Sequence, residues 1–157
     1  MSYYIYSTTI GKMYIEETDG FITKLSLIDN NRYPSSKDNL SETPLIRKTY
    51  LEVAEYLKGL RTTFDIPISP NGTTFQKRVW NCLEKIPYGE TKSYQDIAIE
   101  IGNEKACRAV GMANHNNPII ILIPCHRVIG KNAKLVGFGC GINVKEYLLN
   151  LEKRTKK

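Results

Sequence analysis

The apolar residues of this chain change their spacing at Pro70-Asn71-Gly72, and this change limits the possible folds more than any other feature. Residues 1–28 alternate in the manner of strands, whereas from residue 74 onward apolar side chains recur at the spacing of helices. Proline and glycine interrupt both kinds of element. We therefore predict an α+β protein with two lobes: a small N-terminal antiparallel sheet with a helix in residues 1–70, and a mostly helical C-terminal lobe in residues 71–157.

The N-terminal lobe begins with three strand-like segments that end at Thr8, Glu17 and Ile28. The Asp19-Gly20 pair predicts a hairpin turn before the third segment. Residues 30–39 are polar and predict a loop. Alternation places the following side chains on one face of the third strand: Phe21, Thr23, Leu25 and Leu27.

A helix and a further strand complete the N-terminal lobe in this prediction. Thr43-Pro44 is typical of a helix N-cap and first turn, and apolar residues then recur at helical spacing until Gly59. We expect this helix to pack on the sheet. Phe64–Ile68 predicts one more short strand.

The C-terminal lobe is expected to open and close with amphipathic helices. The first carries an apolar stripe from Phe75 to Ile86, with Trp80 elsewhere on its surface. The inner face of the last helix is predicted to consist of Val144, Tyr147, Leu148 and Leu151.

Two short helices between them predict a helix-turn-helix. Ser93 and Asp96 have the spacing of a capping box, Gly102 ends that helix, and Asn103 can cap the next one. The second helix is rich in alanine and glycine, so it suits either close helix packing or insertion into a DNA groove, and composition alone does not decide between them. Its predicted inner face consists of Ala106, Ala109, Val110 and Ala113.

The positive charge of the chain is concentrated in the C-terminal lobe. Residues 71–157 hold 14 Lys and Arg against 7 Asp and Glu, whereas residues 1–70 hold 8 against 9. A net charge of +7 favours a polyanionic partner, with nucleic acid as the first candidate. The alternative is a solvated basic surface with a frayed C-terminal tail, residues 153–157, that supplies 4 of the 14 charges.

Several common classes of protein are not expected. No apolar run approaches the roughly 20 residues that span a bilayer, and the N-terminus lacks the pattern of a signal peptide. We therefore expect a cytoplasmic protein without a membrane partner, whose four cysteines are reduced thiols. No C-x-x-C pair occurs and the two histidines lie outside any ligand cluster, so we expect no metal site.

One of these cysteines, Cys125, has the surroundings of a nucleophile. It follows Pro124 and a short apolar run, and it precedes His126 and Arg127. An imidazole can take the thiol proton and a nearby cation lowers the thiol pKa. On an extended chain adjacent side chains point apart, so a bridging water would be needed between thiol and imidazole. The alternative is a buried packing cysteine beside a satisfied core histidine.

The string Pro124-Cys125-His126-Arg127-Val128-Ile129 resembles the active-site signature of the O6-alkylguanine-DNA alkyltransferases, also called methylated-DNA-protein-cysteine methyltransferases. The resemblance covers residues 74–152 closely and the first lobe only in outline. Further matches in the order of the family are Ser93-Tyr94-Gln95, Arg108-Ala109-Val110-Gly111, Ala113-Asn114, Asn117-Pro118, Gly137-Phe138, Gly141, Lys145, Leu148, Leu149 and Glu152.

The resemblance implies a suicidal alkyl transfer that needs no cofactor. Cys125 would take the alkyl group from O6 of guanine, or from O4 of thymine, and remain an S-alkylcysteine. His126, bridged by water and oriented by Glu152, would keep Cys125 as a thiolate, with Asn117 holding the local hydrogen bonds. Tyr94 would donate to the guanine ring as charge develops.

The resemblance also implies how DNA is held. Arg108 would enter the minor groove of the duplex and fill the space of a flipped nucleotide. Binding would show little sequence preference, and a monomer is expected. Other DNA contacts would come from Ser93, Ala106, Ala109, Gly111 and Arg127. The substrate pocket would include Phe138, Gly139 and Cys140, where the chain departs from the commonest residues of the family.

Two other functions remain as alternatives. A non-catalytic helix-turn-helix DNA-binding module would explain the charge but leaves Cys125 and His126 without a use. A cysteine hydrolase would use that pair but gives no reason for Arg108 and the basic lobe.

Overall fold

The computed structural model describes residues 1–28, 39–130 and 142–155, and it confirms the α+β class. Contacts divide the chain into two compact units, Met1–Asn71 and Gly72–Lys157. The loop predicted at residues 30–39 falls outside the described residues, apart from its last position.

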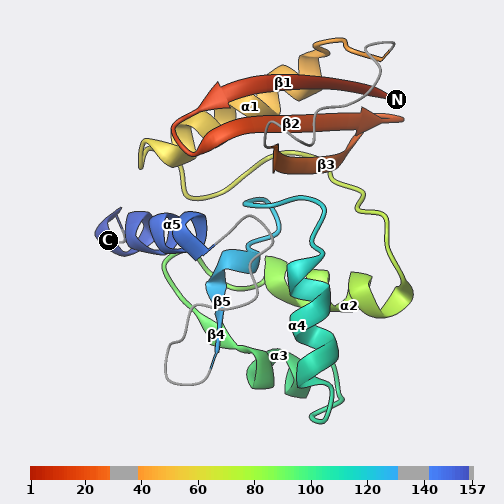
Figure 1. Cartoon of the computed structure of the whole chain (residues 1–157), viewed down its shortest axis with the longest axis vertical. Helices are drawn as coiled ribbons and strands as arrows, with labels where there is room; N and C mark the ends of the chain where they lie inside the picture. Colours follow the sequence, from red (N-terminus) through yellow and green to blue (C-terminus); the bar gives the residue numbers. More distant parts are fainter. Residues whose placement is uncertain (29–38, 131–141, 156–157) are drawn as a thin grey trace. The chain divides into compact units, whose positions relative to one another are not determined.

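The first unit contains a three-stranded antiparallel sheet in the order β1-β2-β3 (Figure 1). Asp19 and Gly20 have positive φ values of 52° and 83°, as the type I′ turn of a two-residue hairpin requires, which confirms the predicted turn. The strands are β1 (Ser2–Thr8), β2 (Gly11–Thr18) and β3 (Phe21–Ile28).

The face predicted for β3 is wrong at its beginning. Glu16 pairs with Lys24 but Glu17 pairs with Ile22, so Thr23 is an extra residue in β3 and forms a β-bulge. The bulge breaks the alternation of side chains. Ile22 and Thr23 are therefore both buried, while Phe21 is 45% exposed.

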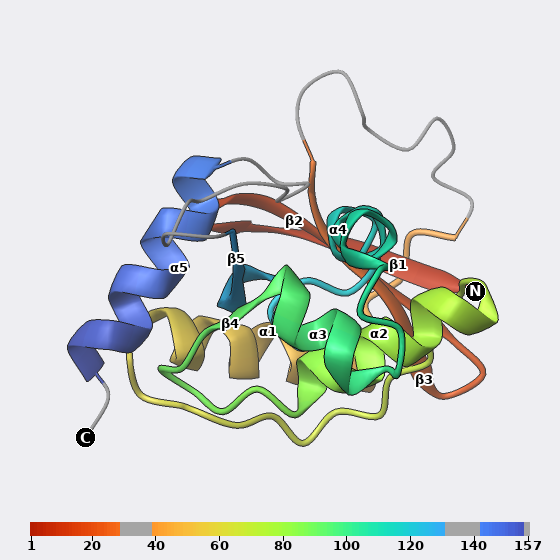
Figure 2. The ribbon, with the colours of Figure 1, turned by 90° about the horizontal axis from the view of Figure 1, so that it is seen from below.

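Helix α1 (Pro44–Leu57) covers one face of this sheet (Figures 1 and 2). The Thr43 hydroxyl accepts a hydrogen bond of 3.1 Å from the Ile46 amide, which confirms the predicted N-cap. Gly59 follows the helix with a φ of +77°. Ile46, Val53 and Leu57 are buried, as the helical spacing predicts, whereas Tyr50 and Ala54 of the same predicted face are half-buried.

The strand predicted at Phe64–Ile68 is wrong. Only Ile68 forms a bridge to the sheet, through bonds of 2.9 Å from the Ile22 amide to the Pro67 carbonyl and from the Ser69 amide to the Ile22 carbonyl. Pro67 has no amide hydrogen to donate, so a longer ladder cannot form through it.

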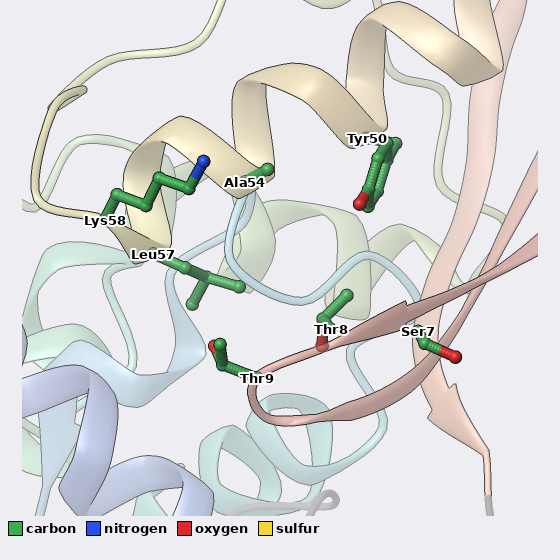
Figure 3. A pocket seen from close by; sticks show the side chains of 7 residues that line it. All are labelled: Ser7, Thr8, Thr9, Tyr50, Ala54, Leu57 and Lys58. Carbon is green, nitrogen blue, oxygen red and sulfur yellow. The ribbon is translucent and has the colours of Figure 1, made fainter.

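A hollow of about 350 Å³ lies between α1 and the turn that follows β1 (Figure 3). The Thr8 hydroxyl there is engaged in the turn, since it donates to the Gly11 carbonyl at 2.6 Å and accepts from the Ile10 amide at 3.2 Å. None of the described residues that line the hollow carries an acid, thiol or imidazole, so this part of its lining lacks the groups of a reaction centre. Its lining consists of Ser7, Thr8, Thr9, Tyr50, Ala54, Leu57 and Lys58.

The second unit is mostly helical. Helices α2, α3 and α4 pack on one another, and η1 contacts α2 and α5. Strands β4 and β5 form a short parallel pair, and β4 leads directly into α3 (Figure 2). Within the described residues no helix has both the length and the apolarity to cross a membrane. The elements are α2 (Thr74–Glu84), β4 (Lys92–Ser93), α3 (Tyr94–Glu100), α4 (Cys107–His115), η1 (Cys125–Arg127), β5 (Val128–Ile129) and α5 (Ile142–Thr155).

Trp80 lies in the core of this unit, so its predicted surface position is wrong. Its side chain is 2% exposed, and its indole Nε1 donates to the Ala113 carbonyl at 2.8 Å. The bond joins α2 to α4. Gly72 fits closely over the same ring, because a Cβ at this glycine would lie 2.5 Å from Cη2 of Trp80.

We predict that Trp80→Phe lowers the free energy of unfolding by about 2 kcal/mol, because it removes the indole and leaves the buried Ala113 carbonyl without this donor. Urea denaturation followed by circular dichroism measures the loss. Ile99→Ala, at a side chain that is 57% exposed, is the control and should change the midpoint little. Equal effects of both substitutions would contradict the core position of Trp80.

Candidate active site and nucleic-acid interface

Cys125 lies at the start of a tight 3-10 turn, not on the extended chain that the sequence suggested. The apolar run before it is also a turn, with a bridge between Ile120 and Ile123 and a φ of +71° at Ile121. The Cys125 amide donates to the Ile123 carbonyl at 2.7 Å. A positive φ at a β-branched residue is costly, so surrounding contacts must hold this turn.

Asn117 makes two of those contacts. Its Nδ2 donates to the Ile123 carbonyl at 2.8 Å, and its Oδ1 accepts from the Ile119 amide at 3.0 Å. The side chain therefore spans both ends of the apolar turn. Because the turn leads into Pro124 and Cys125, Asn117 fixes the backbone that presents the thiol, whose residue is only 2% exposed.

His126 and Glu152 form a buried pair. His126 Nε2 lies 2.6 Å from Glu152 Oε2, and the two side chains are 0% and 1% exposed. Burial lowers the pKa of His126 despite the opposing effect of Glu152. Burial alone would raise the pKa of Glu152, but hydrogen bonds and charge from His126 and Arg127 bring it well below its ordinary value. Glu152 is therefore a carboxylate and His126 a neutral imidazole that donates from Nε2.

Arg127, expected among the DNA contacts, is turned into the protein instead. Its Nε donates to Glu152 Oε1 at 2.8 Å, its Nη2 to Glu152 Oε2 at 3.0 Å, and its Nη1 to the Ile86 carbonyl at 2.7 Å. The side chain is 8% exposed. The prediction of a DNA contact is corrected, because all three nitrogen atoms already have buried acceptors.

Lys145 and Tyr94 lie close enough to Cys125 to interact with it electrostatically. Burial lowers the pKa of Lys145 to about 8, and the nearby Cys125 partly opposes this shift. Its Nζ donates to the Val128 carbonyl at 2.5 Å and lies 5.9 Å from the centre of the Tyr94 ring. Burial, together with Cys125, raises the pKa of Tyr94.

Lys145 matches a motif of the family in sequence, but no role was predicted for it. The inner face of α5 contains Lys145, Leu148, Leu151 and Glu152, whereas Tyr147, predicted inside, is 38% exposed. The spacing of Lys145, Leu148 and Glu152 on one helical face was the available signal, since a charged residue in such a stripe needs a buried partner.

The structure of the helix pair α3 and α4 confirms one prediction and corrects another. The Ser93 hydroxyl accepts from the Asp96 amide at 3.0 Å, and Asp96 accepts from the Ser93 amide at 2.9 Å, which confirms the capping box. Asn103 does not cap α4. Residues 103–106 instead form a turn closed by a 3.0 Å bond from the Ala106 amide to the Asn103 carbonyl, and Ala106 occupies the N-cap position.

The outer face of α4 borders a hollow of about 770 Å³. Arg108 and Ala109 are exposed on it, so the prediction that Ala109 faces inward is wrong; Val110, Ala113 and Asn114 take the inner positions. A Cβ on Gly111 would lie 4.0 Å from the Tyr94 ring, an ordinary contact. The hollow is lined by Lys105, Ala106, Cys107, Arg108, Ala109 and Met112.

The predicted pocket residues Phe138, Gly139 and Cys140 lie outside the described residues. In the parts of the chain that the structure describes, His, Cys, Asp and Glu side chains form no group of three or more that could hold a metal ion.

Comparisons with known proteins show which family the chain resembles. Residues 74–154 match the family described as "6-O-methylguanine DNA methyltransferase, DNA binding domain". The methylated-DNA–protein-cysteine methyltransferase of Methanosarcina acetivorans is 42% identical over 97% of this chain and 98% of its own length. The constitutive enzyme of that name from Bacillus subtilis is 42% identical over 100% of this chain and 99% of its own length.

Solved structures give the same result. A crystal structure of Mycobacterium tuberculosis O6-methylguanine methyltransferase is similar with a TM-score of 0.89 and 41% identity, over 99% of this chain and 94% of that one. A structure of the Mycobacterium tuberculosis protein in complex with DNA has a TM-score of 0.88 and 40% identity over the same shares of the two chains. The chain belongs to the methylated-DNA–protein-cysteine methyltransferase family.

Proposed function

We propose that this protein repairs alkylated DNA by transferring an alkyl group from O6 of guanine to Cys125, once and irreversibly. The observation that carries the proposal is the site itself, in which a thiol on a rigid turn is followed by a neutral imidazole held by an ionised carboxylate. Family membership over nearly the whole chain supports it.

The electron and proton balance of the reaction uses groups at this site. Sγ of Cys125 attacks the alkyl carbon, the bond from that carbon to O6 breaks, and its electron pair stays on the guanine, which takes up one proton to become neutral. The thiol proton passes through water to Nδ1 of His126, because Nε2 already donates to Glu152. The positive charge of Lys145 near the thiol favours the thiolate, and Tyr94 donates to the guanine as charge develops.

The product explains why the protein acts once. A thioether has no leaving group that water displaces readily, so Cys125 stays alkylated. O4 of thymine has the same chemistry and is proposed as a second substrate. One chain supplies the nucleophile, base and DNA-contacting helix, so we propose that the protein acts as a monomer. We also propose that it is cytoplasmic. Residues 71–157 would bind DNA and react, while residues 1–70 support them.

A target atom on the paired edge of guanine requires the nucleotide to leave the stack. Cys125 is 2% exposed, so a stacked base cannot reach its thiol. We propose that α4 enters the minor groove, where its small residues allow close approach and base readout is degenerate. Exposed Arg108 would fill the vacated space.

Duplex DNA with one O6-methylguanine should add one methyl group to each protein molecule, on Cys125. Intact-mass and peptide-mass spectrometry measure the stoichiometry and the position. Excess substrate should not raise the yield above one.

Cys125→Ser is the matched control and should gain no mass while still binding DNA. A non-catalytic DNA-binding module would gain none in either form, and a cysteine hydrolase would not retain the methyl group. Equal gain by Cys125→Ser would refute the assigned nucleophile.

Arg108→Ala should slow repair of duplex DNA by about 100-fold and change the reaction with free O6-benzylguanine by less than about 3-fold, because only the duplex needs a residue in the vacated space. Rates from single-turnover labelling compare the two substrates. Lys24→Ala, in the first unit, is the control for loss of one positive charge. Equal losses on both substrates would contradict the proposed role of Arg108.

The neutral state of His126 makes stability depend on pH. Its pKa in the folded protein is below the ordinary value of 6.5, so the unfolded chain binds a proton that the folded chain does not. The free energy of unfolding should therefore fall as the pH drops below about 6.5, by up to about 1.4 kcal/mol per pH unit. Urea titrations between about pH 7 and 5.5 measure the slope.

His126→Gln should be less stable than the wild type at neutral pH but should flatten this slope, because no group with a lowered imidazole pKa remains at the position. His115→Gln removes the exposed histidine of α4 and should leave the slope unchanged. The reverse pattern in the two variants would show that His126 is not the neutral buried group.

A further inference from the structure

The side chain of Arg127 is fixed by hydrogen bonds at all three of its guanidinium nitrogen atoms. Its three guanidinium nitrogen atoms donate to two different acceptors, the Glu152 carboxylate and the Ile86 carbonyl, at 2.7 to 3.0 Å. The guanidinium carbon lies 5.6 Å from the centre of the Tyr88 ring. The planar fork matches the carboxylate on both oxygen atoms, a geometry that lysine cannot reproduce.

The Glu152 carboxylate accepts four hydrogen bonds, two of them from Arg127. Oε1 accepts from Arg127 Nε at 2.8 Å and from the Gly89 amide at 3.0 Å. Oε2 accepts from Arg127 Nη2 at 3.0 Å and from His126 Nε2 at 2.6 Å. The plane of the carboxylate is thus fixed by Arg127 and Gly89, and His126 meets an oxygen whose direction is already set.

The charge of Arg127 also determines where the proton of the pair resides. His126 is surrounded by Glu152, Arg127 and Lys145, and the two cations both disfavour an imidazolium. With Arg127 present, the negative charge of Glu152 is balanced by the guanidinium, so His126 need not become charged. Without Arg127, His126 would be the only other side chain of the described residues bonded to the buried Glu152 carboxylate that can become a cation. The imidazole would then take up a proton.

We propose that Arg127 is a positioning residue for alkyl transfer: through Glu152 it keeps His126 neutral, with its proton on Nε2, so that Nδ1 can accept the thiol proton. This inference rests on the proposed function. It gives Arg127 a task inside the protein in place of the DNA contact that the sequence suggested.

The first arm of the test is the rate of transfer from free O6-benzylguanine, which avoids any effect on DNA binding. Arg127→Met keeps an unbranched side chain without charge and should be slower by about 100-fold at pH 7, with the rate recovering at higher pH as His126 loses its extra proton. Arg127→Lys keeps one charge and should be slower by about 10-fold. Arg154→Met, exposed on α5, is the control and should match the wild type.

The second arm observes the proton directly. The chain has two histidines, so ¹⁵N-histidine labelling gives two sets of ring signals, which His115→Gln assigns. Wild-type His126 should show a protonated Nε2 and an unprotonated Nδ1 at pH 7. Arg127→Met should show both nitrogen atoms protonated, and Arg127→Lys a mixture of the two states.

A shift of His126 toward imidazolium together with the rate loss supports the proposal. A folded Arg127→Met whose His126 signals match the wild type overturns it, whether the rate falls or not, because a purely structural role would leave the tautomer unchanged. If Arg127→Met does not fold, Arg127→Lys is judged by the same signals. A wild-type protein that transfers no alkyl group overturns the proposed function, whereas the ring signals still decide whether Arg127 controls His126.

Discussion

The packing of the second unit depends on the hydrogen bonds that the buried Glu152 carboxylate accepts. Glu152 lies on α5 and binds His126 and Arg127 of η1 and the Gly89 amide of the connection between α2 and β4. Three segments that are distant in sequence therefore meet at one buried anion. Burying a carboxylate is costly unless every lone pair has a donor, and here both oxygen atoms have two. The same requirement that stabilises the fold places a neutral imidazole beside Cys125.

The elements that could be predicted from sequence are those with local causes. Thr43 and Ser93 cap their helices through bonds to residues three positions away, and Asp19-Gly20 forms a turn that needs positive φ at both positions. Such signals lie within a few residues of one another. The bulge at Thr23 could not be predicted, because it depends on the pairing of β3 with Glu16 and Glu17 in another strand.

The site divides in the same way. Cys125 and His126 are adjacent in sequence, and the resemblance to a family pointed to Glu152, whose contact with His126 is 2.6 Å in the structure. The direction of Arg127 could not be obtained from its neighbours, because it depends on the Ile86 carbonyl and on Glu152. The burial of Trp80 likewise depends on a carbonyl of α4. A cationic side chain or an indole on an amphipathic segment is expected on the protein surface. Its burial depends on a hydrogen-bond acceptor that is distant in sequence.

The burial of Cys125 bears on which chemistry the site can perform. A cysteine hydrolase must admit a water molecule to its covalent intermediate and release the product, so its nucleophile is normally open to solvent. At 2% exposure, Cys125 instead favours a reaction that ends with the group still attached. In the proposed reaction the neutral His126 takes one proton from the thiol and the released guanine takes up one proton, while Cys125 remains a thioether. The burial of Cys125, a balanced proton transfer and a single turnover are therefore consistent with one another.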